Sequence, residues 1–175
     1  MKDSASRMRL FNGHQKMNEQ SLKKVFLTNL SNIYSIKSYL IDNLPLMAES
    51  ATFIDLKNAI LESVDEIRIQ LLRIESIFKI LNETYHPGRC LGIKAFIIEA
   101  YRAATEPGVT NFEADFTILY HLRALEALES ACYDSLYDMA RSMPNPDMST
   151  LLKHNLDMAN DSGNLYKLIT KEYLN

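Results

Sequence analysis

The chain of 175 residues has few residues that interrupt a helix, with only five glycines and five prolines, and it has no tryptophan. Most of the glycines and prolines lie between apolar-rich segments, so they divide the chain into long helices. No segment alternates apolar and polar residues for long enough to form a β-strand. The sequence therefore predicts an all-α fold.

Several functional classes lack the residues that they require. The formal net charge is −3, and Lys and Arg form no cluster that could neutralise phosphates, so we expect no nucleic-acid partner. No apolar run reaches the length of a membrane span, and the polar start MKDSASRMRLFNGHQKMNEQ has no apolar signal core, which favours a cytoplasmic protein that does not enter a membrane. Motifs of the GxSxG, phosphate-loop and GxGxxG types are absent, so nucleophilic catalysis and nucleotide binding have no support.

Cysteine and histidine are also too sparse for a metal or redox motif. Cys90 and Cys132 lie far apart without a CxxC pair, and we expect both to be buried reduced thiols. The four histidines are scattered along the chain, and none is paired with a carboxylate residue at zinc-ligand spacing on a helix.

Apolar residues spaced alternately four and three positions apart predict the helices. We expect a flexible tail over residues 1–19 and one helical domain over 20–175. Within that domain the predicted helices cover about 20–43, 53–82, 90–105, 111–142 and 148–173. Thr52 and Asp55 predict a capping box at the start of the second helix, and Pro45 is expected to bend or end the first. This order predicts an up-and-down four-helix bundle followed by a C-terminal fifth helix.

The second predicted helix also carries apolar residues outside its core-facing row. Its additional apolar residues are Leu61, Ile69, Leu72 and Ile80. Because a helix with a second apolar face can bury it against another chain, we expect a homodimer.

Charged residues interrupt the core-facing rows. Lys37, Lys94 and Glu129 each occupy a position where an apolar residue is due, Glu66 precedes Ile67, and Glu126 lies one turn before Glu129. Two interpretations stay open. Each side chain could reach solvent at a bundle end or flank, or the set could meet near the middle of the bundle. Glutamates that project inward from four helices are the architecture of di-iron carboxylate proteins, but here two of the four positions are lysines.

Four stretches, in this order, resemble a known family. They are LSNIYSIKSYLIDNLPLMA at 30–48, LRIESIF at 72–78, RCLGIKAFI at 89–97 and LEALESACY at 125–133. The chain resembles, over about residues 24–173, the ferritin-like bacterial family typified by YciE and YciF, which is associated with stress responses and has no resolved function. The resemblance implies a ferritin-like bundle.

The resemblance also implies a former metal site. The family's glutamates on the first and third helices fall on Lys37 and Lys94, and a histidine of the second helix falls on Ser63. The glutamates at Glu66, Glu126 and Glu129 are retained. If Lys37 and Lys94 face Glu66 and Glu129, a Lys/Glu salt-bridge cluster balances the charge without metal. Glu126 would then be protonated, bonded to a hydroxyl such as that of Tyr34, or turned to water.

We therefore expect a stress-associated, non-enzymatic structural or binding protein without a metal cofactor. The alternative is an enzyme that uses Glu66, Glu126 and Glu129 to bind one iron or manganese ion for oxygen or peroxide chemistry, although the two lysines would oppose the cation. A small-ligand pocket in the bundle is a third possibility, for which the sequence gives no specific sign.

Overall fold

The computed structural model describes residues 17–88 and 90–175, and these residues form five helices. Most of the predicted tail, residues 1–16, lies outside the described residues. The helices are α2 (Glu19–Ser50), α3 (Ile54–Ile80), α4 (Leu91–Ala104), α5 (Asn111–Arg141) and α6 (Pro146–Glu172). The described residues form no β-strand, so the predicted all-α fold is confirmed.

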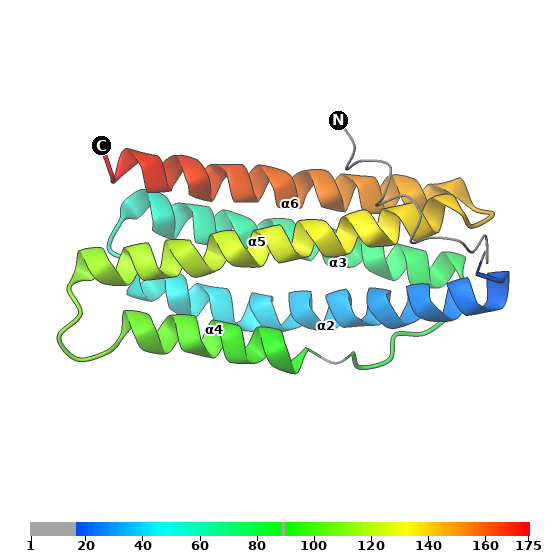
Figure 1. Ribbon diagram of the computed structural model, residues 1–175, viewed down its shortest axis with the longest axis horizontal. Helices are drawn as coiled ribbons and strands as arrows, with labels where there is room; N and C mark the ends of the chain where they lie inside the picture. Colours follow the sequence, from blue (N-terminus) through cyan, green and yellow to red (C-terminus); the bar gives the residue numbers. More distant parts are fainter. Residues whose placement is uncertain (1–16, 89) are drawn as a thin grey trace, which may run out of the picture.

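The four long helices form a closed ring. Helix α2 packs on α3, α3 on α6, α6 on α5 and α5 on α2, whereas α4 packs outside the ring against α5 and α2. The colours of Figure 1 show that neighbouring helices of the ring run in opposite directions. Helix α4 returns the chain along the length of the bundle, so that α5 starts at the same end as α3.

A four-helix bundle with a fifth helix was predicted, but two helices exchange places. The helix outside the ring is the short α4, and the C-terminal α6 is one of the four. Length and burial explain the exchange. Helix α4 has 14 residues and buries only Ile97, Ala100 and Ala104, while α6 has 27 residues and contributes a full buried row.

Most helix starts carry local caps. The side chains of Asn18 and Asn145 accept hydrogen bonds from the first turns of α2 and α6, and Thr110 forms a capping box with Glu113 at α5. Pro45 does not end α2, which continues to Ser50.

The start of α3 differs from the prediction. Its N-cap residue, Phe53, makes no side-chain capping bond, so the box expected from Thr52 and Asp55 is not formed. Instead the buried carboxylate of Asp115 on α5 accepts hydrogen bonds from the backbone N–H groups of Thr52 (2.9 Å) and Phe53 (2.6 Å). The negative charge also complements the positive end of the helix dipole.

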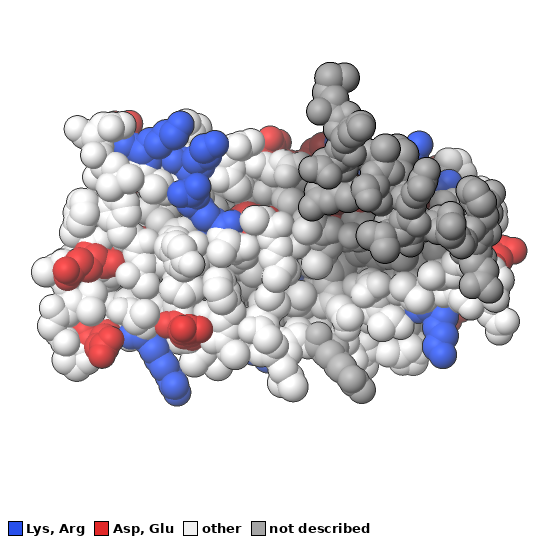
Figure 2. All heavy atoms as spheres, viewed as in Figure 1, with Lys and Arg blue, Asp and Glu red and all other residues white. Residues whose placement is uncertain are grey.

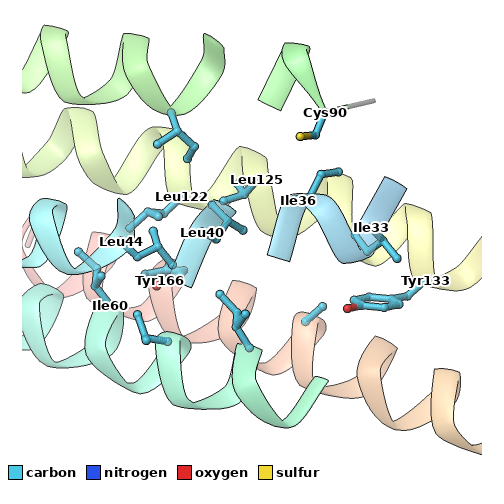
Figure 3. Close-up of a cluster of buried hydrophobic side chains, with 14 of the residues drawn as sticks. Ile33, Ile36, Leu40, Leu44, Ile60, Cys90, Leu122, Leu125, Tyr133 and Tyr166 are labelled. Carbon is cyan, nitrogen blue, oxygen red and sulfur yellow. The ribbon is translucent and has the colours of Figure 1, made fainter. Parts of the chain in front are cut away.

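The core lies along the axis of the ring. Figure 3 shows Ile33, Leu40 and Leu44 of α2 and Leu122 and Leu125 of α5 directed into the space between the helices. On the face drawn in Figure 2, charged side chains lie mostly toward the ends and edges, and much of the surface is uncharged.

Among the described residues, no helix combines the length and the apolar character needed to cross a membrane.

Candidate functional site

A lysine and a glutamate meet inside the apolar core. Lys37 of α2 is 1% exposed and Glu129 of α5 is fully buried, and the Nζ of Lys37 donates a hydrogen bond to Oε2 of Glu129. Both occupy the positions that the 4,3 spacing assigns to the core. The pair therefore bridges two neighbouring helices of the ring.

The surroundings of the pair supply only part of the hydrogen bonds that its buried polar atoms can make. The Nζ of Lys37 lies 5.8 Å from the ring centroid of Tyr133, and the Oε1 of Glu129 is buried without a hydrogen-bond partner among the described residues. Burying two charges costs free energy that their attraction only partly offsets, whereas removing one partner leaves an unpaired buried charge. The interaction therefore specifies how α2 and α5 pack more than it stabilises the fold.

Glu126 lies one turn before Glu129 and is also buried. Burial, together with the neighbouring carboxylate of Glu129, raises the pKa of its carboxyl to about 8, although the ammonium group of Lys37 acts in the opposite direction. At neutral pH this carboxyl is therefore protonated and uncharged. A Cβ atom at Gly163 would lie 3.5 Å from the Cβ of Glu126, so α6 passes close to this side chain.

Two hydroxyl contacts hold the α3 and α6 sides of the site. The half-buried Glu66 accepts a hydrogen bond from Oγ of Ser162 (2.6 Å), and Oγ of Ser63 lies 2.7 Å from the hydroxyl of the buried Tyr166. Burial and the nearby Glu126 raise the pKa of the Tyr166 hydroxyl, which stays protonated. The three glutamates of the site thus differ in their surroundings: Glu129 is bonded to a lysine, Glu66 is bonded to a serine, and Glu126 is protonated.

A further polar layer joins α3, α5 and α6. The Nδ2 of Asn155 donates to the backbone carbonyl of Gln70 (3.2 Å), Arg73 donates to Oδ1 of Asn155 (3.2 Å), and the Tyr133 hydroxyl approaches Oε1 of Gln70 (3.5 Å). Burial and Glu129 raise the pKa of Tyr133. These contacts order the helices around the Lys37–Glu129 pair.

The sequence interpretation missed the contribution of α6, although a signal was present. Residues 152, 155, 159, 162, 166 and 169 follow the alternating three and four spacing, and all are buried. This row includes Asn155, Ser162 and Tyr166. Because two of its members are strongly polar, the spacing of apolar residues in α6 is less regular, and it gives only a weak signal of a core-facing row.

Lys94 does not join the site, which corrects the proposed set of two lysines and two glutamates. Its helix, α4, packs outside the ring, and its ammonium group lies over the ring of Tyr39, 5.2 Å from the centroid. The suggested bond between Tyr34 and Glu126 is also corrected, because the Tyr34 hydroxyl donates to Glu75 (2.9 Å). Of the residues expected at the site, the ring carries Lys37, Ser63, Glu66, Glu126 and Glu129.

Both cysteines are free thiols, as expected, but only Cys90 is buried, whereas Cys132 is half-buried. Burial, with Glu129 nearby, raises the pKa of the Cys132 thiol. It is therefore protonated and unreactive at neutral pH.

These residues do not fit a pair of metal ions. In the described ranges, no three His, Cys, Asp or Glu side chains are grouped so as to hold a metal ion. One oxygen of Glu129 is bonded to an ammonium group, Glu66 is bonded to Ser162, and Glu126 is protonated near pH 7. Metal ligands must be deprotonated and free of competing cations, so Glu126 fails the first condition and Glu129 fails the second.

Comparison with known proteins identifies relatives of the fold. A model of the family described as a domain of unknown function (DUF892) matches residues 21–173. YcfI from Rhodopseudomonas palustris, described as a candidate structural protein, is 24% identical with a TM-score of 0.80, and the match covers 89% of this chain and 97% of YcfI.

The Escherichia coli stress protein YciF is 22% identical with a TM-score of 0.80, and the match covers 86% of this chain and 94% of YciF. No curated protein matches. At these identities the two structures show a shared helical-bundle fold.

Proposed function

The chain belongs to the DUF892 family, a family of domains of unknown function, and from this premise we propose a role based on the interior of its own bundle. The protein is a stress-associated, non-enzymatic structural or binding protein. In it, the Lys37–Glu129 ion pair replaces the di-metal carboxylate site that the family resemblance implies.

The observation that carries this proposal is the position of the Lys37 ammonium group, buried in the core and bonded to Glu129. A metal ion at this carboxylate would lie within a few ångströms of a positive charge in a medium of low dielectric constant. The repulsion there is much stronger than in water. The lysine thus supplies the positive charge that a metal would otherwise supply.

The proposed link to stress rests on the fold shared with YciF, which is named as a stress protein. The proposed structural role has the same kind of support from YcfI. If the link holds, the cellular level of this protein should rise under osmotic or oxidative stress. An unchanged level under both conditions would contradict the stress association and leave the metal argument unaffected.

Elemental analysis after metal loading tests the central claim. The purified protein is incubated anaerobically with excess Fe(II) and Mn(II) and then desalted. We expect well below one metal ion per chain to be retained. The Lys37→Glu variant removes the competing cation and adds a carboxylate, so it should retain more metal and be stabilised by Mn(II). Lys37→Gln, which removes the charge without adding a ligand, is the matched control.

One observation favours a second candidate, a residual iron or manganese site for oxygen or peroxide chemistry. Oε1 of Glu129 has no hydrogen-bond partner in the described part of the chain, the charge of Glu66 acts nearby, and Glu126 would add a second carboxylate once it loses its proton. Near-stoichiometric metal in the folded wild-type protein would support this candidate. It would also overturn the proposal that Lys37 replaces the metal.

A further inference from the structure

One end of the bundle carries a groove that opens onto the core. It lies where α2 begins, α3 ends and α5 turns into α6, and Figure 1 shows these three places at the same end of the molecule. The groove has a volume of about 770 Å³, and its apolar lining residues are Ile80, Leu81, Met143, Pro144 and Met148. Met148 is 1% exposed and belongs to the core, whereas Ile80 is 36% exposed. The described residues therefore leave apolar surface uncovered at this end of the core.

Backbone contacts hold both walls of the groove in place. Asn82 has a left-handed conformation with φ of 51°, and the N–H of Glu83 donates to the carbonyl oxygen of Phe78 (3.0 Å), so that α3 ends here. On the other wall, Oδ1 of Asn145 accepts a hydrogen bond from the N–H of Asp147 (2.9 Å). A C-terminal turn and an N-terminal cap of these kinds fix the direction of the chain. The groove is thus preformed, as binding sites usually are.

The N-terminal segment of the chain joins the bundle at the edge of this groove. Asn18, Glu19 and Gln20 belong to the lining, so residues 1–16 connect to the described structure beside it. Within residues 2–16 the large apolar side chains gather in the stretch MRLF at 8–11, and most of the other residues are polar or charged. This stretch is therefore the part of the segment that gains most from burial.

Leu10 and Phe11 are close enough in sequence to reach the groove. Seven residue steps separate Phe11 from Asn18, and they span at most about 25 Å in an extended chain. Asn12 and Gly13 lie between them, and this pair favours a turn that lets the chain reverse its direction. Because both partners belong to one chain, their effective concentration is on the order of millimolar, and a weak apolar contact is enough to hold them together.

A second apolar groove lies farther from the start of α2. It runs between α2 and α5, has a volume of about 540 Å³, and is lined by residues that include Ile33, Ile36 and Leu128. Its lining on α2 starts at Asn29, ten residues beyond Glu19 and so about 15 Å along the helix. A shorter loop closes onto the nearer groove, and shorter loops cost less entropy. The position of the segment thus favours the groove at the bundle end.

We propose that residues 1–16 fold back onto the bundle and place Leu10 and Phe11 in the groove between Leu81 and Met143. The occupant is the N-terminal segment of the same chain. Docking covers the apolar surface at this end of the core, and release of the segment exposes it again. The segment is therefore a strap over the bundle end and not a free tail.

Photo-cross-linking in the full chain tests where the segment docks. Phe11 is replaced by the photoreactive residue p-benzoylphenylalanine, the protein is irradiated, and the cross-linked peptides are identified by mass spectrometry. Cross-links should form within one chain and fall on residues 80–81 and 143–148. Cross-links mainly to residues 128–139 would place the segment in the second groove, and cross-links between two chains would place it on a second copy. Either result, or the absence of any cross-link to the bundle, would overturn the proposal.

Two substitutions at similarly exposed positions give a matched comparison. Ile80 in the first groove is 36% exposed, and Leu128 in the second is 40% exposed. In the photoreactive protein, Ile80→Ser should lower the yield of the expected cross-link several-fold because it removes apolar contact area, whereas Leu128→Ser should leave the yield unchanged. Circular dichroism confirms that each variant is folded. Equal yields in the two variants would contradict docking in the first groove.

Methionine methyl resonances provide a second measurement without a photoreactive group. Leu10→Ser/Phe11→Ser in the full chain should shift the methyl resonances of Met143 and Met148, which line the groove. The resonance of Met47, which is buried near the other end of α2, should stay unchanged. Unshifted resonances of Met143 and Met148 would show that the segment does not occupy the groove.

Discussion

At the scale of single residues, the site is defined by one lysine in an apolar row. Lys37 lies between Ile33 and Leu40 in the core-facing row of α2, and its partner Glu129 occupies the matching row of α5. Any apolar residue would pack at either position without a desolvation cost. Because a charge tolerates only the arrangement that supplies its partner, the pair selects one register of α2 against α5.

Replacing Lys37 alone should destabilise the protein strongly. In Lys37→Met the carboxylate of Glu129 stays buried without a counter-charge, and we expect a loss of about 3–5 kcal/mol in the free energy of unfolding. The double variant Lys37→Met/Glu129→Leu removes both charges and should lose much less. Urea unfolding of both single variants and the double variant gives the coupling energy. A double loss equal to the sum of the single losses would exclude the pairing.

The raised pKa of Glu126 predicts an unusual pH dependence of the free energy of unfolding. Its pKa is about 8 in the folded protein and near 4.5 in the unfolded chain. Between these values the unfolded chain releases a proton that the folded chain keeps, so stability falls as the pH rises and levels off above about pH 8. Glu126→Gln lacks this titration. Relative to the variant, the wild type should lose on the order of a few kcal/mol between pH 5 and pH 9. Parallel urea-unfolding profiles for the two proteins would contradict the raised pKa.

At the scale of helices, the spacing of apolar residues predicts which segments are helical, but it does not predict where each helix lies in the bundle. The rows of α2, α3 and α5 were visible because nearly all of their members are apolar, and they led to Lys37 and Glu129. Lys94 lies in an equally regular row, but its helix packs outside the ring, and spacing does not tell which face of the bundle a helix covers. The row of α6 was overlooked because Asn155 and Ser162 are polar, although both are buried.

Helix capping shows a second limit of local patterns. A capping box is read within four consecutive residues, but the cap of α3 comes from Asp115, which is 62 residues away from Phe53. Such a contact depends on how α5 packs beside α3. No local pattern contains it.

Removing this distant cap should cost more than removing a local one. Asp115→Ala leaves two backbone N–H groups at the start of α3 without a charged acceptor, and we expect a loss of about 2–3 kcal/mol. Asp115→Asn keeps one acceptor oxygen and should lose less. Thr110→Ala, which removes the local cap of α5, should cost about 1 kcal/mol. Thermal unfolding of the three variants gives the order, and a smaller loss for Asp115→Ala than for Thr110→Ala would contradict it.

The segment between α3 and α4 contains a glycine whose substitution should destabilise the protein by a similar amount. A Cβ atom at Gly88 would lie 2.6 Å from Cα of Asn32 and from the carbonyl oxygen of Ser31, both backbone atoms of α2. The Gly88 N–H also donates to Oγ of Ser35 (2.8 Å). Gly88→Ala should therefore push the segment off α2 and cost about 1–3 kcal/mol.

Gly92 in α4 is the control for this substitution. A Cβ atom there would meet nothing within 4 Å. Gly92→Ala should leave stability unchanged or raise it by up to about 1 kcal/mol, since alanine favours a helix. Equal melting temperatures for the two variants would show that the segment does not depend on close packing at Gly88.

At the scale of the whole molecule, the closed ring and the outer helix should differ in stability. Each long helix packs on two others, and α4 rests on α2 and α5 from outside with three buried residues. A helix that contributes little buried surface can open without unfolding the rest. The ring, by contrast, loses its core contacts when any one of its members leaves.

Hydrogen exchange followed by mass spectrometry tests this division. Amides of α4 should exchange faster than those of the four ring helices, through an opening that leaves the ring folded. Ile97→Ala removes one of the three buried residues of α4, so it should speed exchange in α4 and leave protection in α2, α3, α5 and α6 nearly unchanged.

Leu152→Ala in α6 should behave differently. Leu152 is fully buried in the ring, and its truncation should lower the free energy of unfolding by about 2–5 kcal/mol and reduce protection in all four long helices together. If Ile97→Ala reduced protection equally in every helix, α4 would be part of the same cooperative unit as the ring. The bundle would then unfold as five interdependent helices, and the weaker packing of α4 would have no consequence for its dynamics.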